Sequence, residues 1–249
     1  MLDFTTLLIL VLLAYLGGGI IKGIIGMGLP TISIGVLSLF IAPAQAAGYM
    51  IIPAFATNIW QGLHGPYLRK LLKRFWTLYV GMFAGSWVTA GILTNAQSGL
   101  AAGVLGLLLA AYAVFSLTDP KFHISKRTET WLSPIVGVTM GMVMGATGIF
   151  VMPSVPYMQA LDLKRDELVQ SIGLLFTAAT AALTLILFVH GLMPATTIGL
   201  SALAVVPAIL GMVIGRRIRA RIDPQTFRRV FLVGMLVLGL SLAVRSFVF

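Results

Sequence analysis

The chain reads GGGIIKGIIGMGLP at positions 17–30, where a glycine-rich break followed by proline interrupts an apolar stretch. A second run of this kind, GMVMGATGIFVMP, occupies positions 141–153. Proline interrupts helices, and both glycine and proline are more frequent in membrane helices than in soluble ones. Two apolar segments with the same kind of break predict two related halves, each with a broken helix.

The composition is that of a lipid-embedded protein. Of the 249 residues, 59% are hydrophobic and 10% are charged, a balance that excludes an ordinary soluble domain. No charged residue lies between Lys22 and Arg69, and further charge-free stretches cover 75–118, 130–161, 168–215 and 230–244. One helical span needs about 20 apolar residues, so 75–118 and 168–215 each hold two spans. We therefore predict an all-α integral membrane protein.

Fifteen of the seventeen Lys and Arg residues lie in four loops: Arg69, Lys70, Lys73 and Arg74; Lys121, Lys126 and Arg127; Lys164 and Arg165; and Arg216, Arg217, Arg219, Arg221, Arg228 and Arg229. Short cytoplasmic loops collect such residues, so we expect all four in the cytoplasm and both chain ends outside. This accounts for the net charge of +10 without a nucleic acid partner. Residues 131–161 must then leave the cytoplasm and return to it.

The segments that satisfy this topology lie at about 3–25, 30–41, 44–63, 75–94, 97–117, 131–149, 152–161, 167–190, 195–215 and 229–247. They form a first transmembrane repeat over 1–118, a cytoplasmic linker over 119–130 and a second repeat over 131–249. Each half has an odd number of segments, about five. The second half therefore has the opposite orientation in the membrane to the first. Inverted repeats with short, broken helices near the midplane are typical of secondary transporters.

Each half also carries a pair of glycines four residues apart on a later helix. Gly81 and Gly85 form the pair in the first half, and Gly211 and Gly215 form it in the second. Small residues at this spacing let membrane helices approach closely. We expect both pairs to lie at helix contacts.

The two glycine-rich runs, in two hydrophobic halves that a basic loop separates, resemble the TauE/SafE sulfite exporter family over the whole chain. The resemblance implies a transporter of small anions such as sulfite, organosulfonates or similar oxyanions and carboxylates, with export as the expected direction. Two residues depart from the family pattern, Met27 and Leu29, where the first half is often richer in glycine. The expected location is the cytoplasmic membrane.

The breaks themselves offer groups that suit an anion. The amino end of a half-helix presents free N–H groups and a partial positive charge, and helices starting at Pro30 and near Met152 would provide two such ends. The candidate substrate-binding residues beside them are Gly26, Gly28, Thr31 and Ser33 in the first half, and Gly145, Thr147, Gly148 and Ser154 in the second. The alternative is that the glycines serve helix packing and the hydroxyls bond to their own backbone.

Polar side chains on the long helices are the next candidates. Asn58 and Gln61 are three residues apart and share one helix face, and Gln170 and Thr177 lie on the corresponding segment of the second half. Inside a membrane such groups either line a pathway or hold helices together. Both interpretations stay open for these four residues.

Lys22 is the single cation of the first 68 residues. A lysine beside a substrate route would attract an anion and offset the hydration that the anion loses. The alternative is that Lys22, near the end of its helix, extends its ammonium group to the membrane surface.

Chemistry other than transport finds little support. All seven acidic residues fall in loops or at segment ends, so an intramembrane carboxylate for ion coupling is missing. His64 and His190 are the candidates for coupling to protons. Exchange against a counter-anion is the other form of coupling that stays open. Without cysteine, we expect no metal site and no cofactor, and we interpret Met140, Met144 and their neighbours as packing residues. An anion channel is the first alternative, and a polytopic membrane enzyme, for which no motif is present, is the second. Membrane lipid is an expected partner of the basic loops.

Overall fold

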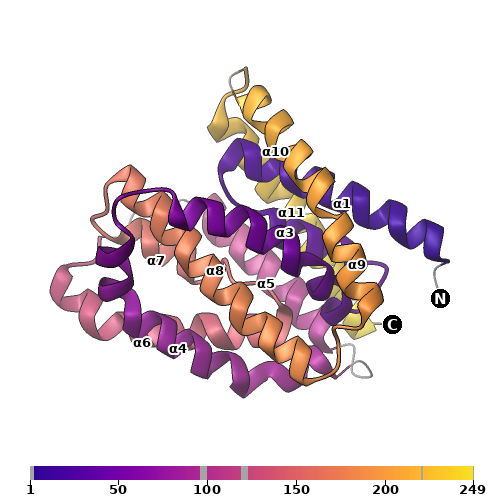
Figure 1. Cartoon of the computed structure of the whole chain (residues 1–249), viewed down its shortest axis with the longest axis horizontal. Coiled ribbons are helices and arrows are strands. Elements are labelled where there is room, and N and C mark those ends of the chain that lie inside the picture. The colour runs from indigo at the N-terminus through magenta and orange to yellow at the C-terminus, as the bar shows by residue number, and fades with distance from the viewer. Residues whose placement is uncertain (1–2, 96–99, 119–122, 220, 249) are drawn as a thin grey trace.

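The computed structural model describes residues 3–95, 100–118, 123–219 and 221–248, which fold into a bundle of helices (Figure 1). Asp119 and Lys121 lie outside these residues. Seven helical segments in the described ranges are long and apolar enough to cross a membrane. The prediction of an all-α membrane protein is confirmed.

The first half follows the predicted order of a long helix, a short helix and further long helices, and the second half departs from it where its fourth segment is divided into two helices. The first half consists of α1 (Phe4–Ile25), α2 (Leu29–Leu37), α3 (Pro43–Leu63), α4 (Leu68–Thr94) and α5 (Leu100–Leu117). The second half consists of α6 (Lys126–Thr147), α7 (Ser154–Ala160), α8 (Arg165–Val189), α9 (Ala195–Leu203), α10 (Val205–Arg219) and α11 (Pro224–Val248).

Left-handed glycines end the first helix of each half, as the two glycine-rich runs predict. Gly26 has φ of 92° and its N–H donates to the Lys22 carbonyl. Gly148 has φ of 77° and its N–H donates to the Met144 carbonyl. Glycine enters this region without the strain that a side chain would cause. Lys22 and Met144 therefore occupy the same place relative to the two breaks.

The glycine pairs lie where two helices meet backbone to backbone. A Cβ at Gly85 would overlap the Val138 carbonyl of α6, and a Cβ at Gly211 would overlap the Leu16 carbonyl of α1. Gly81 and Gly215 make the same kind of contact, against Pro134 and Ile20. The predicted close approach is confirmed for both pairs.

The two halves exchange partners. The first helix of each half packs on the fourth segment of the other, since α1 lies against α10 and α6 against α4. The third helices, α3 and α8, pack on each other, and so do α5 and α11. A two-fold relation between inverted halves would produce this pairing, while the inversion itself and the repeat boundaries stay predictions.

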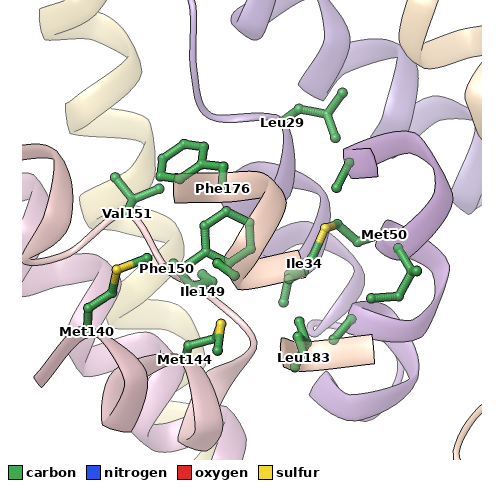
Figure 2. Packing of buried hydrophobic residues seen from close by; sticks show 14 of the residues in the cluster. Leu29, Ile34, Met50, Met140, Met144, Ile149, Phe150, Val151, Phe176 and Leu183 are labelled. Atoms are coloured by element: carbon green, nitrogen blue, oxygen red, sulfur yellow. The ribbon is translucent and has the colours of Figure 1, made fainter. Parts of the chain in front are cut away.

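The core lies where the second break crosses the bundle. Ile149, Phe150 and Val151 follow Gly148 outside any helix and point into a cluster with residues of neighbouring helices (Figure 2). The Phe150 ring meets the Phe176 ring edge to face, with centroids 4.9 Å apart. Met140 and Met144 are fully buried in this cluster, so their interpretation as packing residues is confirmed.

Two ion pairs join the starts of three helices. The Arg74 guanidinium donates to both carboxylate oxygens of Glu129, at 2.6 and 2.7 Å, and Lys70 pairs with Glu167. These contacts bring the starts of α4, α6 and α8 together, and Arg228 adds the start of α11 by donating to Ser116 at the end of α5. The basic loops therefore share one end of the bundle, which we call the basic end.

Three corrections to the predicted boundaries have a local cause; besides these, α2 ends at Leu37 instead of 41 and α11 begins at Pro224 instead of 229. Helix α4 begins at Leu68 instead of 75, and the predicted start coincides with a kink at Phe75 (φ −107°, ψ 15°). Helix α6 begins at Lys126, inside the predicted linker. Charged residues extend both helices beyond their apolar spans. The charge-free stretches therefore predicted the membrane-spanning part of each helix and not where the helix begins.

The third correction concerns the segment predicted at 195–215. It is divided into α9 and α10 at Ala204 and extends to Arg219. The ring of Pro207 conflicts with a helical carbonyl at Leu203, four residues earlier, which explains the break.

Replacement of Gly85 by Ala should lower the unfolding temperature of the purified protein, because the new methyl group overlaps the Val138 carbonyl. Overpacking of this kind typically costs about 1–3 kcal/mol. Gly91 lies on the same helix, and a Cβ added there would have no atom within 4 Å. Gly91→Ala is therefore the matched control and should unfold at the native temperature or above it. Equal unfolding temperatures for the two variants would show that the α4–α6 contact adapts.

The topology can be tested with single cysteines, because the native chain has none. Thiols introduced at Arg127, Arg217 or Asn95, all exposed, should react with an impermeant reagent on intact cells only at Asn95. Arg127 and Arg217 lie in the predicted cytoplasmic loops. Labelling at position 217 would exclude the inverted arrangement of five and five segments.

Candidate functional site

Lys22 lies inside the bundle and not at its surface. The residue is 4% exposed, and its Nζ donates to Thr57 Oγ1 at 2.9 Å and to Asn58 Oδ1 at 2.5 Å. Both partners belong to α3 and are themselves buried. The interpretation that Lys22 extends to the membrane surface is wrong.

The local structure of α1 and α3 explains this geometry. Gly23, beside Lys22, lies against Met212 and Gly215 of α10, so the close contact occupies one side of α1 and leaves Lys22 to face α3. On α3, Thr57 Oγ1 donates to the Pro53 carbonyl at 2.8 Å. The hydroxyl proton is therefore engaged, and a lone pair of Thr57 Oγ1 accepts the Lys22 bond.

The charge of Lys22 has only neutral partners in the described structure. The buried carboxylates of Glu129 and Glu167 pair with Arg74 and Lys70, and no ion pair involving Lys22 is present among the described residues. A buried ammonium group without an opposite charge is unfavourable because it has lost its hydration. The Asn58 Nδ2 group beside it is buried without a hydrogen-bond partner. An anion at this place would neutralise the charge and accept a hydrogen bond from the unused Asn58 amide group.

A groove reaches this cluster from the outside of the bundle. It has a volume of about 300 Å³ and lies between Ala56, Thr57 and Trp60 of α3 and Ile209, Met212, Val213 and Arg216 of α10. Arg216 is in the last turn of α10, at the basic end. Since Thr57 lines the groove and also accepts the Lys22 bond, Lys22 lies one hydrogen bond behind the groove wall.

A model of the family described as sulfite exporter TauE/SafE matches residues 10–242. The chain belongs to the TauE/SafE family. This match confirms the resemblance seen in the two glycine-rich runs and covers nearly the whole chain, including Lys22, Asn58 and the groove. The family is one of transporters, and the chain is a multi-pass membrane protein of it. No curated protein and no solved structure matches the chain.

The hydroxyls predicted beside the breaks mostly bond to backbone in this TauE/SafE chain. Thr147 and Ser154 donate to carbonyls of their own helix or its preceding turn, and Ser33 donates to Ala14 of α1. Thr177, predicted on the long helix of the second half, donates to Gly173 within α8. Thr147 also accepts from the Ile149 N–H and so holds the second break. These contacts match the structural alternative for Thr147 and Ser154, whereas Ser33 joins α2 to α1.

Thr31 differs from the other hydroxyls, because its Oγ1 is buried without a partner. It lines a cavity of about 10 Å³ together with Ile149, Val151 and Met152 of the second break. The two breaks therefore meet at Thr31. The cavity has room for about one water molecule and not for a sulfite-sized anion.

The four predicted glycines have different surroundings. A side chain at Gly26 would meet open space, whereas one at Gly148 would meet Ala47, Ile34 and Leu183. Gly28 lies near Ile21 and Phe231, and Gly145 lies against the Ser86 backbone of α4. Gly145 is therefore a helix contact, and the structure does not bring the four glycines into one cavity.

The two glutamines hold helices together. Gln170 donates to the Gly62 and Gly65 carbonyls and accepts from the Tyr67 N–H, all at 3.0–3.1 Å. Gln61 donates to the Val169 carbonyl. Both residues join α8 to the end of α3, and neither is hydrogen-bonded to Lys22, Thr57 or Asn58 among the described residues.

His64 and His190 end α3 and α8. These helices are antiparallel, since Gly62 meets Gly173 near the start of α8, so the two histidines do not form one site. His64 stacks on Trp60 with ring centroids 3.8 Å apart. Within the described ranges, no group of three or more His, Asp or Glu residues is arranged to hold a metal ion.

Sequence reasoning did not select Thr57, Trp60 and Arg216 as site residues. Thr57 carried a signal, because it is adjacent to Asn58 and follows Pro53 by one turn. Arg216 was assigned to a basic loop, and nothing in the sequence predicts that α10 carries it to the Lys22 side of α3.

Replacement of Gln170 by Ala should lower the unfolding temperature, because three backbone groups between α3 and α8 lose their side-chain partner. An unsatisfied buried group typically costs about 1–3 kcal/mol. Anion affinity of the folded fraction should be unchanged. Gln159 is exposed, so Gln159→Ala is the control and should unfold at the native temperature. Lost affinity in a stable Gln170→Ala protein would instead place Gln170 in the binding site.

Proposed function

We propose that this TauE/SafE protein carries a small anion across the cytoplasmic membrane and binds it at Lys22 during transport. The observation that supports this proposal is the buried ammonium group of Lys22, whose hydrogen-bond partners, Thr57 and Asn58, are both neutral. A positive charge in that position favours the entry of an anion and disfavours that of a cation.

The donors suit an oxyanion such as sulfite, an organosulfonate or a carboxylate. The anion would accept from Lys22 Nζ and from the unused Asn58 Nδ2 group, each of which fits one oxygen. Arg216 at the groove raises the local anion concentration by its charge. Export is the direction that the family description suggests, and it requires loading from the basic end if that end is cytoplasmic.

Release on the far side also follows from these groups. A single ammonium group and an amide bind less strongly than a cluster of guanidinium groups, so the anion can leave again. Carriers need this balance between binding and release. A channel is the second candidate, although the packed core around Phe150 and Phe176 (Figure 2) favours a carrier, because no open pathway crosses that part of the described structure.

Lys22→Met should weaken sulfite binding and lower sulfite exchange in proteoliposomes while the protein remains folded. Met keeps the apolar length of the side chain and removes the charge together with the bonds to Thr57 and Asn58. Loss of one charge-assisted contact weakens binding by about tenfold or more. The measurement is counterflow of labelled sulfite into vesicles that contain unlabelled sulfite, which also separates a carrier from a channel.

Lys73→Met is the matched control, because Lys73 is an exposed lysine of a basic loop and its loss should leave counterflow unchanged. Native counterflow in a folded Lys22→Met protein would exclude Lys22 as the anion ligand. Asn58→Ala should reduce affinity as well, whereas Gln61→Ala should not, since Gln61 bonds to Val169.

A further inference from the structure

Arg245 is the one residue among the seventeen Lys and Arg that belongs neither to the four basic loops nor to the Lys22 cluster. It lies in the last turn of α11. Helix α11 starts at the basic end, so Arg245 lies at the opposite end of the bundle, where Figure 1 marks both chain ends. An arginine there contradicts the charge bias of the chain and needs a local explanation.

Arg245 borders a cavity of about 320 Å³. The cavity is lined by the turn between α2 and α3, which includes Ser38, Phe40 and Ala42, by Ala102 of α5, and by Leu242 and Arg245 of α11. The Arg245 guanidinium donates one bond, from Nη1 to the Leu39 carbonyl at 3.1 Å. A guanidinium has five N–H donors, so this bond anchors the side chain and leaves donors for a ligand.

Two further groups of this cavity suit an anion. Ser38 is 9% exposed, and its hydroxyl is buried without a hydrogen-bond partner. Helix α3 begins next to the cavity at Ala42, where no side chain caps the helix end. Pro43, the first residue of this 21-residue helix, has no N–H, but the positive end of the helix adds to the field of Arg245.

We propose that this cavity is a second anion site, in which Arg245 binds a small oxyanion and the Ser38 hydroxyl donates to it. Planar guanidinium groups bind oxyanions through paired hydrogen bonds. Arg245 is exposed, so exchange with the surrounding water is direct. A role of this site on the route between Lys22 and the outside rests on the proposed function. Binding of an anion at Arg245 does not depend on it.

The test uses the absence of cysteine from the chain. Phe40, which is 50% exposed, lines the cavity, and a Phe40→Cys protein has a single thiol there. The rate of its alkylation by a maleimide is measured in sulfate and in chloride at equal ionic strength. Sulfate is the probe because sulfite reacts with maleimides. Bound sulfate should slow the reaction, and Arg245→Gln should raise the sulfate concentration needed by about tenfold.

Two controls make the result specific. Asn95→Cys places an exposed thiol elsewhere, and sulfate should not change its rate. Lys22→Met in the Phe40→Cys protein should keep the protection, since the two sites are separate. Equal rates in sulfate and chloride at position 40, equal slowing at position 95, or unchanged protection in Arg245→Gln would overturn the second site. None of these results bears on counterflow at Lys22, so the two proposals fail separately.

Discussion

Glycines four residues apart let α1 approach α10, and α4 approach α6, until the backbone of one helix occupies the space that a side chain of the other would need. Much of the remaining structure depends on this contact. The contact covers one side of α1, so Lys22 faces α3. It places Arg216 of α10 beside Gly23, the residue that follows Lys22. It also holds the first helix of each half on the opposite half. A membrane bundle gains little from apolar contacts alone, because lipid is equally apolar, and close backbone packing supplies the stability instead.

The fold could be predicted from the sequence where the signal was local. Glycine before proline marked both breaks, and charge-free runs marked the long helices. Charged residues at helix starts made the predicted boundaries wrong, because α4 continues through Arg69 to Arg74 beyond its apolar span. The pairing of Arg74 with Glu129 could not be predicted, since it joins residues 55 positions apart. Such contacts depend on how the helices pack and not on local preference.

The candidate site was predictable in part for the same reason. Lys22 and Asn58 stood out as polar residues in apolar helices, but spacing along one helix cannot say which residues of another helix they meet. The hydroxyls beside the breaks were weaker candidates, because Thr147 and Ser154 find carbonyls within one turn and such local bonds need no tertiary structure. Met144 stands in the second half where Lys22 stands in the first, so related breaks carry different chemistry.

The unpaired charge of Lys22 has an electrical consequence. A monovalent anion bound beside Lys22 makes the loaded site neutral, whereas the empty site keeps one positive charge. The membrane potential then acts on the empty protein as it reorients and not on the loaded one. Moving one elementary charge across the full potential corresponds to about 2.3 kcal/mol per 100 mV. On the proposed function, net anion movement is therefore electrogenic, whereas an exchange of one anion for another, which never passes through the empty form, is not.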